Sequence, residues 1–131
     1  FDVFDNFLAI EERVAGLRKV RIRPWAGARE FHIDSDEPAY RMALDANEEV
    51  DSEIVRYTYT SLTTPRTTYD YDTRTGERVL LKREPVLGDF DPAQYETEYL
   101  WVPARDGECV PVAIVYPPSP LRRDGRPPLL Q

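Results

Sequence analysis

The sequence is poor in the residue types that build most catalytic and metal centres. It contains one cysteine, Cys109, and one histidine, His32. A single cysteine closes no disulfide within the chain, and neither residue has the neighbours that a metal site or a Cys-His pair requires. None of the serines is flanked by glycines as in a nucleophile elbow. We therefore expect no catalytic, metal-binding or cofactor-binding residue in this chain.

Long apolar runs and an excess of basic charge are also absent. No stretch has the length and apolarity of a membrane span, and no basic segment followed by an apolar run opens the chain as in a signal peptide. The net charge of −7 disfavours nucleic acid, whose binding depends on clustered Lys and Arg. With one unpaired cysteine, these features predict a soluble, cytoplasmic protein without a membrane or nucleic-acid partner.

What the chain does have is proline and a period-two alternation of apolar residues. Twelve prolines argue against a helical bundle, and the alternation indicates a mainly β fold. Asp91-Pro92 opens one helical turn, over residues 91–95. The predicted strands are Asn6–Val14, Leu17–Pro24, Glu30–Ile33, Tyr40–Leu44, Glu53–Leu62, Thr67–Asp72, Arg78–Lys82, Glu98–Arg105 and Cys109–Tyr116.

The sequence matches itself at an offset of 49 residues. The matched pairs are Leu8/Tyr57, Ile10/Tyr59, Val20/Tyr69, Ile22/Tyr71, Gly27/Gly76 and Phe31/Leu80. Repeats of about 50 residues with three or four short strands are typical of β-propeller blades. The repeat predicts a partial β-propeller of about two blades, the first lacking its innermost strand. Two unrelated antiparallel meanders with similar turn spacing remain the alternative.

Propeller blades need neighbours, so further blades are expected upstream. Each blade buries its faces against the next, and a propeller needs at least about four blades to close. Phe1 already belongs to an alternating segment, and the last residues break off within an apolar run. Both ends look cut, which predicts that the chain is a fragment of a larger protein.

The composition of the sequence changes after the second repeat, where the period-two alternation ends. Residues 83–92 are rich in proline and acid and read as a linker. Beyond them, Asp106-Gly107 is a two-residue turn between two apolar strands, which predicts an antiparallel hairpin. Pro103 and Pro111 place this hairpin at a sheet edge or at a bulge. The apolar run Val110–Tyr116 suggests that its second strand is covered on both faces.

The chain carries, in order, the motifs Phe1–Phe4, Glu11–Arg13, Tyr59–Pro65, Thr68–Asp72, Gly76-Glu77, Leu80–Lys82, Phe90–Pro92, Glu98–Trp101, Ala104–Gly107 and Val110–Val112. In content and order they resemble the prolyl oligopeptidase family, and most closely its oligopeptidase B branch. The likeness spans nearly the whole chain, from the end of the propeller to the entry into the α/β-hydrolase domain.

The resemblance implies a cytosolic serine peptidase that cleaves short peptides after Arg or Lys. It implies propeller blades over 1–85, an interdomain linker over 86–98, and the first hairpin of a truncated α/β-hydrolase domain over 99–131. The family's Ser-His-Asp triad and its carboxylates for basic side chains lie outside this chain, so no catalytic or specificity residue is transferred. Expected partners are short basic peptides for the whole enzyme and the remaining blades and catalytic domain of the same protein. The fragment alone should be inactive and prone to self-association.

Four features invite a functional interpretation beside a structural one. His32 alternates with apolar neighbours in a short strand, where we expect a structural or surface role, and Cys109 follows a hairpin turn as a partly covered, inert thiol. The acidic stretch 45–53 could attract basic peptides, although a solvated loop explains it as simply. The tyrosines 57, 59, 69 and 71 could form a stacking surface but more simply pack a blade core.

Ser61–Pro65 is the most interesting local motif. It either forms a rim loop facing an interdomain cavity, or its hydroxyls satisfy backbone groups in a turn, which we favour. For Arg105 the simplest interpretation is a residue of a hairpin turn, and the functional alternative is that it forms an interdomain ion pair. A competing hypothesis for the whole chain is a non-catalytic β-rich binding module, complete as given, whose edges pair with a partner.

Overall fold

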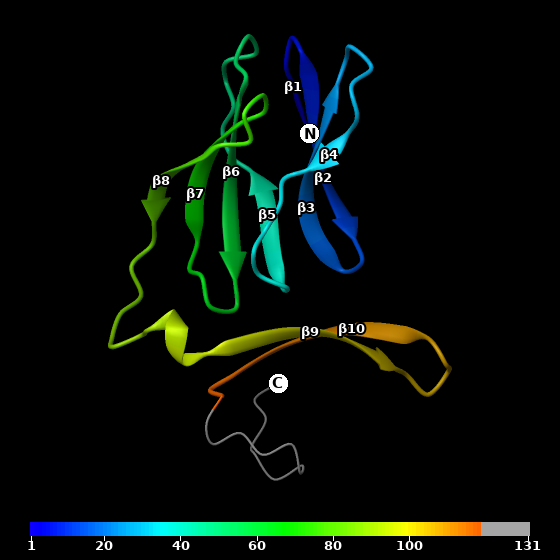
Figure 1. Ribbon diagram of the computed structural model, residues 1–131, viewed down its shortest axis with the longest axis vertical. Helices are drawn as coiled ribbons and strands as arrows, with labels where there is room; N and C mark the ends of the chain where they lie inside the picture. Colours follow the sequence, from blue (N-terminus) through cyan, green and yellow to red (C-terminus); the bar gives the residue numbers. More distant parts are fainter. Residues whose placement is uncertain (119–131) are drawn as a thin grey trace.

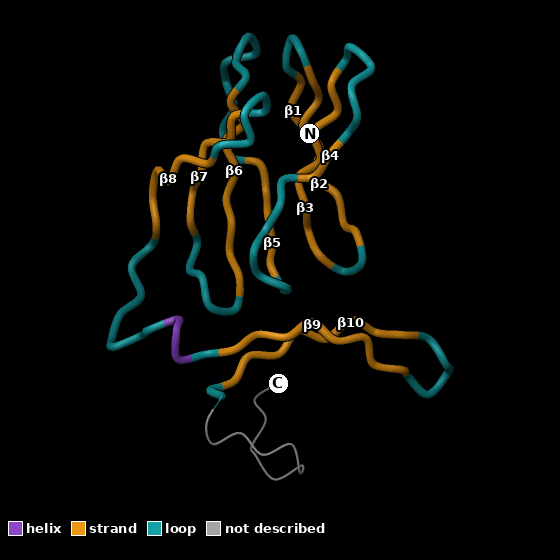
Figure 2. The backbone as a smooth tube through the Cα atoms, in the orientation of Figure 1, coloured by secondary structure: helices purple, strands orange, loops and turns teal. Residues whose placement is uncertain are grey.

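The computed structural model describes residues 1–118 as strands joined by tight turns (Figures 1 and 2). In chain order the elements are β1 (Asp2–Val3), β2 (Phe7–Val14), β3 (Leu17–Pro24), β4 (Phe31–His32), β5 (Tyr40–Leu44), β6 (Ile54–Ser61), β7 (Thr67–Asp72), β8 (Arg78–Arg83), the 3₁₀ turn η1 (Pro92–Gln94), β9 (Glu96–Pro103) and β10 (Cys109–Tyr116). The mainly β prediction is confirmed. The helical turn also lies where Asp91-Pro92 predicts it, with the Asp91 carboxylate accepting a hydrogen bond from the Ala93 N–H.

The strands β1–β8 form two units of four, each a propeller blade. The first unit is β1–β4 and the second is β5–β8, with antiparallel neighbours inside each unit. A single parallel bridge, Arg18 to Arg41, joins β3 of the first to β5 of the second. Figure 1 shows the two units side by side, with β2, β3 and β4 in one and β5 to β8 in the other.

The 49-residue repeat is reproduced only in part by the strand register. Tyr57 pairs with Tyr69, whereas their repeat equivalents Leu8 and Val20 pair with Arg23 and Glu11 and so lie on opposite faces of the first blade. The predicted equivalence of Val20 and Ile22 with Tyr69 and Tyr71 is therefore wrong, because the hairpins β2–β3 and β6–β7 differ in register.

Val3 pairs with Leu8 as Leu44 pairs with Tyr57, and Leu8 and Tyr57 are equivalent repeat positions. Thus β1 occupies the place of the final residues of an innermost strand, of which β5 is the full version. The first blade therefore retains the end of the strand that the sequence predicts it to lack.

The core lies between the facing sides of the two blades. It is built from a cluster of nearly inaccessible side chains that both blades supply, with further half-buried aromatics around it. Phe31 of the first blade meets Tyr71 of the second with ring centroids 6.4 Å apart. The core residues are Phe4, Phe7, Ala9, Val20, Ile22, Ile33, Met42, Val55, Tyr57 and Tyr59. Since the four predicted tyrosines lie in this core or against it, packing is their role.

The opposite face of the first blade carries half-buried apolar side chains. Leu8 and Ile10 point to it, because Phe7 and Ala9 on the same strand point into the core. Their repeat equivalents, Tyr57 and Tyr59, are buried against the first blade. Leu8 and Ile10 thus lie on the face of the first blade that corresponds to the face of the second blade turned toward the first.

The hairpin β9–β10 forms a separate two-stranded sheet that crosses below one end of both blades (Figures 1 and 2). Its register pairs Tyr99 with Ala113 and Trp101 with Pro111, so these four residues share one face. Both strands are edges, as the prolines predict. The expectation that β10 is covered on both faces is wrong for the described chain, because Val110 is 48% exposed and Val115, on the other face, is 43% exposed.

Candidate functional site

The end of the blades that faces the hairpin carries the most distinctive polar cluster in the described chain. Its centre is the carboxylate of Glu37, in the connection between β4 and β5. Glu37 accepts hydrogen bonds from the hydroxyls of Tyr59 and Ser61, both at 2.5 Å, and of Thr63 at 2.7 Å and Thr64 at 2.9 Å. Two loops that are 24 to 27 residues apart are thereby tied together by one side chain.

The charge of Glu37 is stabilised by these hydroxyls and not by a cation. Burial opposes the charge, but the hydrogen bonds from Ser61, Tyr59, Thr63 and Thr64 together outweigh it and lower the pKa of Glu37. Each carboxylate oxygen receives two donors, so no lone pair is left for a ligand. Glu37 therefore fixes the shape of the loop and does not offer a binding group.

The Ser61–Pro65 segment combines the two interpretations that we gave it, a turn whose hydroxyls bind backbone groups and a loop at the rim of a cavity. The Ser61 hydroxyl accepts the backbone N–H groups of Thr63 and Thr64, which is the turn role that we favoured. The threonine hydroxyls instead reach the carboxylate of Glu37. Nothing in the sequence marked Glu37 as their partner, since a loop glutamate beside proline has no pattern of its own. A dense row of hydroxyls is the one signal that a charged acceptor lies nearby.

A groove of about 480 Å³ separates this end of the blades from the hairpin. It is lined on the blade side by residues that include Tyr40 and Leu62, and on the hairpin side by Tyr99, Pro111 and Ala113. The Tyr99 hydroxyl donates a 2.7 Å hydrogen bond to the backbone carbonyl of Ala15, in the turn between β2 and β3. The rim loop thus faces the space between the blades and the hairpin, as its functional interpretation requires.

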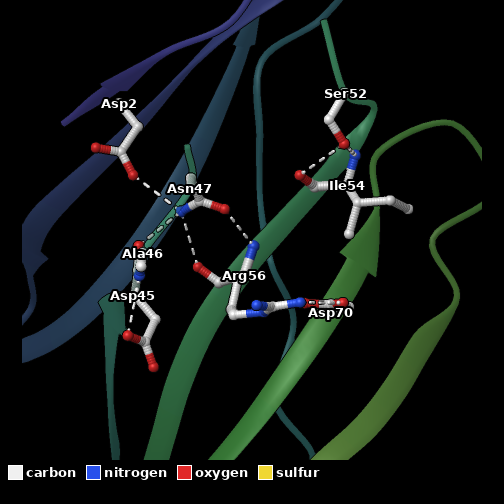
Figure 3. Close-up of polar contacts among 8 residues, drawn as sticks. All are labelled: Asp2, Asp45, Ala46, Asn47, Ser52, Ile54, Arg56 and Asp70. Atoms are coloured by element: carbon white, nitrogen blue, oxygen red, sulfur yellow. Dashed lines mark hydrogen bonds and ion pairs between the residues drawn. The ribbon is translucent and has the colours of Figure 1, made fainter. Parts of the chain in front are cut away.

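A second polar cluster lies at the end of the blades away from the hairpin, in the connection from β5 to β6 (Figures 1 and 3). The Asn47 amide donates to Asp2 Oδ2 and to the carbonyls of Asp45 and Arg56, and accepts the Arg56 N–H. Arg56 also forms a two-point ion pair with Asp70, at 2.8 and 2.9 Å. Asn47, Arg56 and Asp70 line an open hollow of about 460 Å³, but their polar groups are already paired within the cluster. The cluster therefore holds the two blades and the loop in place.

The acidic stretch 45–53 divides between that loop and the solvent. Glu48, Glu49 and Asp51 are exposed, whereas Glu53 accepts hydrogen bonds from Asn6 and Thr73. The stretch lies on the opposite side of the blades from the hairpin (Figure 1). A solvated loop is therefore its observed form.

The single histidine and cysteine are not near each other. His32 Nε2 lies 2.6 Å from Glu12 Oε1, which also pairs with Arg21 at 3.0 Å. Hydrogen bonds from Arg21 and then His32 lower the pKa of Glu12. Cys109 is exposed, and not partly covered as the sequence suggested. Arg105 is also exposed, and among residues 1–118 it forms no ion pair.

Within the described residues, no group of His, Cys, Asp and Glu side chains has the arrangement of a metal site. No helix there has the length and apolarity needed to cross a membrane. Residues 119–131, to which the sequence assigns the continuation of a hydrolase domain, lie outside the described residues.

Comparison with known proteins agrees with the blade architecture. Residues 1–84 match the family model of the prolyl oligopeptidase N-terminal β-propeller domain. Dipeptidyl aminopeptidase BI of Pseudoxanthomonas mexicana is 45% identical over 132 residues, covering 100% of this chain and 18% of the relative. Protease 2 of Moraxella lacunata is 39% identical over 84 residues, covering 64% of this chain and 12% of the relative.

Two solved structures of oligopeptidase B have a similar fold. Oligopeptidase B from Trypanosoma brucei, in a closed form with covalently bound antipain, has 29% identity and a TM-score of 0.78 over 90% of this chain and 18% of its own. Oligopeptidase B from Leishmania major has 28% identity and a TM-score of 0.75, over 89% of this chain and 18% of its own. The chain spans about a fifth of the length of these relatives. It belongs to the prolyl oligopeptidase family, and residues 1–84 are part of the family's N-terminal β-propeller domain.

Proposed function

We propose that the chain is the end of the propeller, the linker and the first hairpin of a serine peptidase that cleaves short peptides after Arg or Lys. The observation that carries this proposal is the hairpin β9–β10, which leaves the blade sheet and forms a sheet of its own. Leu100, Val102 and Val110, on the face turned away from Tyr99 and Pro111, are 37%, 43% and 48% exposed. Such an apolar face requires a further domain to cover it.

The propeller part of this enzyme is proposed to restrict access to the catalytic domain and to contribute no reacting group. Acyl transfer would be carried out by a Ser-His-Asp triad from outside this chain, in a cytoplasmic enzyme. Its partners are the remaining blades, which cover Leu8 and Ile10, and the rest of the catalytic domain. The isolated fragment is expected to hydrolyse no peptide and to self-associate through these uncovered faces.

The test uses the full-length protein that carries this sequence. We expect it to cleave N-terminally blocked peptides after Arg and Lys at least tenfold faster, in kcat/KM, than matched peptides with Ala at that position. A serine-directed covalent inhibitor should abolish the activity. No hydrolysis by the full-length protein would favour the binding-module alternative over a peptidase.

A second candidate is the release of dipeptides from free N-termini. It is favoured by the 45% identity to a relative that is named a dipeptidyl aminopeptidase. Blocking the substrate's N-terminus distinguishes the two candidates, because an aminopeptidase loses its activity on the blocked peptide and an endopeptidase keeps it.

A further inference from the structure

The turn between β2 and β3 is shaped to receive the hairpin. Ala15 and Gly16 both have positive φ, at 51° and 85°, as in the two-residue turns that suit antiparallel hairpins. A non-glycine residue rarely adopts this conformation. It is held here with the Ala15 carbonyl accepting a hydrogen bond from the Tyr99 hydroxyl, across 84 residues of sequence.

Gly16 is in close contact with the same part of the hairpin. A Cβ atom at this position would overlap the Tyr99 hydroxyl and would lie 2.9 Å from Cγ of Pro111. Gly27 also has positive φ, at 73°, but a Cβ there would meet nothing within 4 Å. Gly16 is thus required both for the turn and for the approach of the hairpin, whereas Gly27 is required for its turn alone.

The rest of the boundary between blades and hairpin is open. The groove of about 480 Å³ begins beside Gly16 and separates Tyr40 and Leu62 from Ala113. Close packing between the two parts is therefore concentrated at the Ala15–Gly16 turn with Tyr99 and Pro111. A small contact of this kind breaks and re-forms more readily than a broad buried interface.

We propose that these four residues form an interdomain latch, which holds the propeller against the domain that the hairpin opens and sets how readily the two separate to admit a substrate. This inference rests on the proposed function, because it takes β9–β10 to belong to the catalytic domain. In it Tyr99 and Gly16 are positioning residues, and neither touches the substrate.

The test compares Gly16→Ala with Gly27→Ala in the full-length protein. Both variants strain a positive-φ turn, but only Gly16→Ala obstructs the hairpin. By small-angle X-ray scattering without substrate, we expect Gly16→Ala to increase the radius of gyration and Gly27→Ala to leave it unchanged. We also expect kcat/KM for a short peptide to change at least fivefold in Gly16→Ala and less than twofold in Gly27→Ala. Equal scattering profiles for the two variants would overturn the latch.

Tyr99→Phe provides an independent test should Gly16→Ala fail to fold. It removes the hydrogen bond to Ala15 and should shift the scattering profile toward the open form, whereas Tyr95→Phe, in the linker region, should not. In the double variant Gly16→Ala/Tyr99→Phe, the increase in the radius of gyration should be smaller than the sum of the increases in the two single variants, because loss of the hydroxyl frees space for the new methyl group. An unchanged profile in Tyr99→Phe contradicts the latch. Since scattering needs no substrate, it judges the latch even where the full-length protein cleaves no peptide.

Discussion

The contact between the two blades and the contact between the blades and the hairpin are held together by different forces. Between the blades, residues such as Ile22 and Tyr57 are fully buried and pack in one apolar cluster. Between the blades and the hairpin, Tyr99 donates one hydrogen bond to Ala15 beside an open groove. The first arrangement favours a single cooperative unit, and the second favours two units that can separate.

The largest expected effect tests the buried side of this comparison. Tyr57→Ala removes a fully buried ring from between the blades and should lower the free energy of unfolding of the propeller by about 3–5 kcal/mol. Trp101→Ala removes a larger ring from the hairpin, where it is 51% exposed, and should lower it by less than about 1 kcal/mol. Urea unfolding followed by near-ultraviolet circular dichroism, which reports on aromatic side chains, measures both losses of free energy. Equal losses would mean that the hairpin is as firmly packed as the blades.

The Glu37 cluster should give the next largest effect. Glu37→Gln replaces an acceptor of four hydroxyl donors by an amide that also donates, and should lower the free energy of unfolding by about 1–3 kcal/mol at neutral pH. Ser52→Ala, which removes a hydroxyl that interacts only within its own turn, is the control. Urea unfolding at pH 7 measures both, and a Glu37→Gln loss no larger than that of Ser52→Ala would contradict the role of the cluster.

The same cluster predicts a pH dependence. The pKa of Glu37 is lower in the folded protein than its ordinary value of 4.5, so its stabilisation is complete above that value and is lost as the pH falls through the folded pKa. The difference between the wild type and Glu37→Gln should therefore be constant from pH 7 to about 5 and shrink below about 4. A difference that stays constant down to pH 3 would mean that the charge of Glu37 does not matter.

The ion pair on the outer face of the second blade should matter less. Arg56 is 44% exposed and Asp70 is 20% exposed, so solvent screens their attraction. Replacing Asp70 by Asn should lower the free energy of unfolding by about 0.3–1 kcal/mol, and less in 1 M salt. A loss above about 2 kcal/mol would show that this face is covered in the full-length protein.

The smallest effect concerns the Tyr57 hydroxyl. It is buried and, among the described residues, has no partner in hydrogen-bond geometry, although Arg78 is near enough to offset part of the rise of its pKa to about 12 that burial causes. Tyr57→Phe should therefore leave the free energy of unfolding within about 1 kcal/mol of the wild type, in contrast to Tyr57→Ala. A loss near that of Tyr57→Ala would reveal a partner of this hydroxyl in the full-length protein.

Much of the fold could be predicted because its signals are local or repeated. The 49-residue match correctly places Leu8 and Tyr57 at equivalent positions of two blades, but it wrongly equates Val20 with Tyr69, because the hairpins β2–β3 and β6–β7 differ in register. The Asp91-Pro92 turn is a local signal, because the Asp91 side chain caps the turn that begins at Pro92. The role of Glu37 could not be predicted, because its four partners lie at the end of β6 and in the turn after it, more than 20 residues away, and only the folded chain brings them together.

The contact of Gly16 with the hairpin could not be predicted from the sequence either. Its turn conformation is a local property, but its proximity to Tyr99 and Pro111 depends on how the linker directs β9 across the blades. The prediction that Cys109 and Val110 are covered was wrong for a related reason. An apolar strand indicates that something covers it, but not that the cover lies in the same chain segment.

Hydrogen exchange of the full-length protein under native conditions tests the difference between the two interfaces most directly. We predict that the amides of β2, β3, β5, β6 and β7 exchange together with one high opening free energy. Gly16→Ala should lower this value no more than Gly27→Ala does, because both strain a turn of the first blade, but only Gly16→Ala should accelerate exchange around Tyr99 in the middle of β9. If the amides of the blades and of β9–β10 open together with the same free energy, and Gly16→Ala accelerates both alike, the two contacts are one interface and the account is wrong.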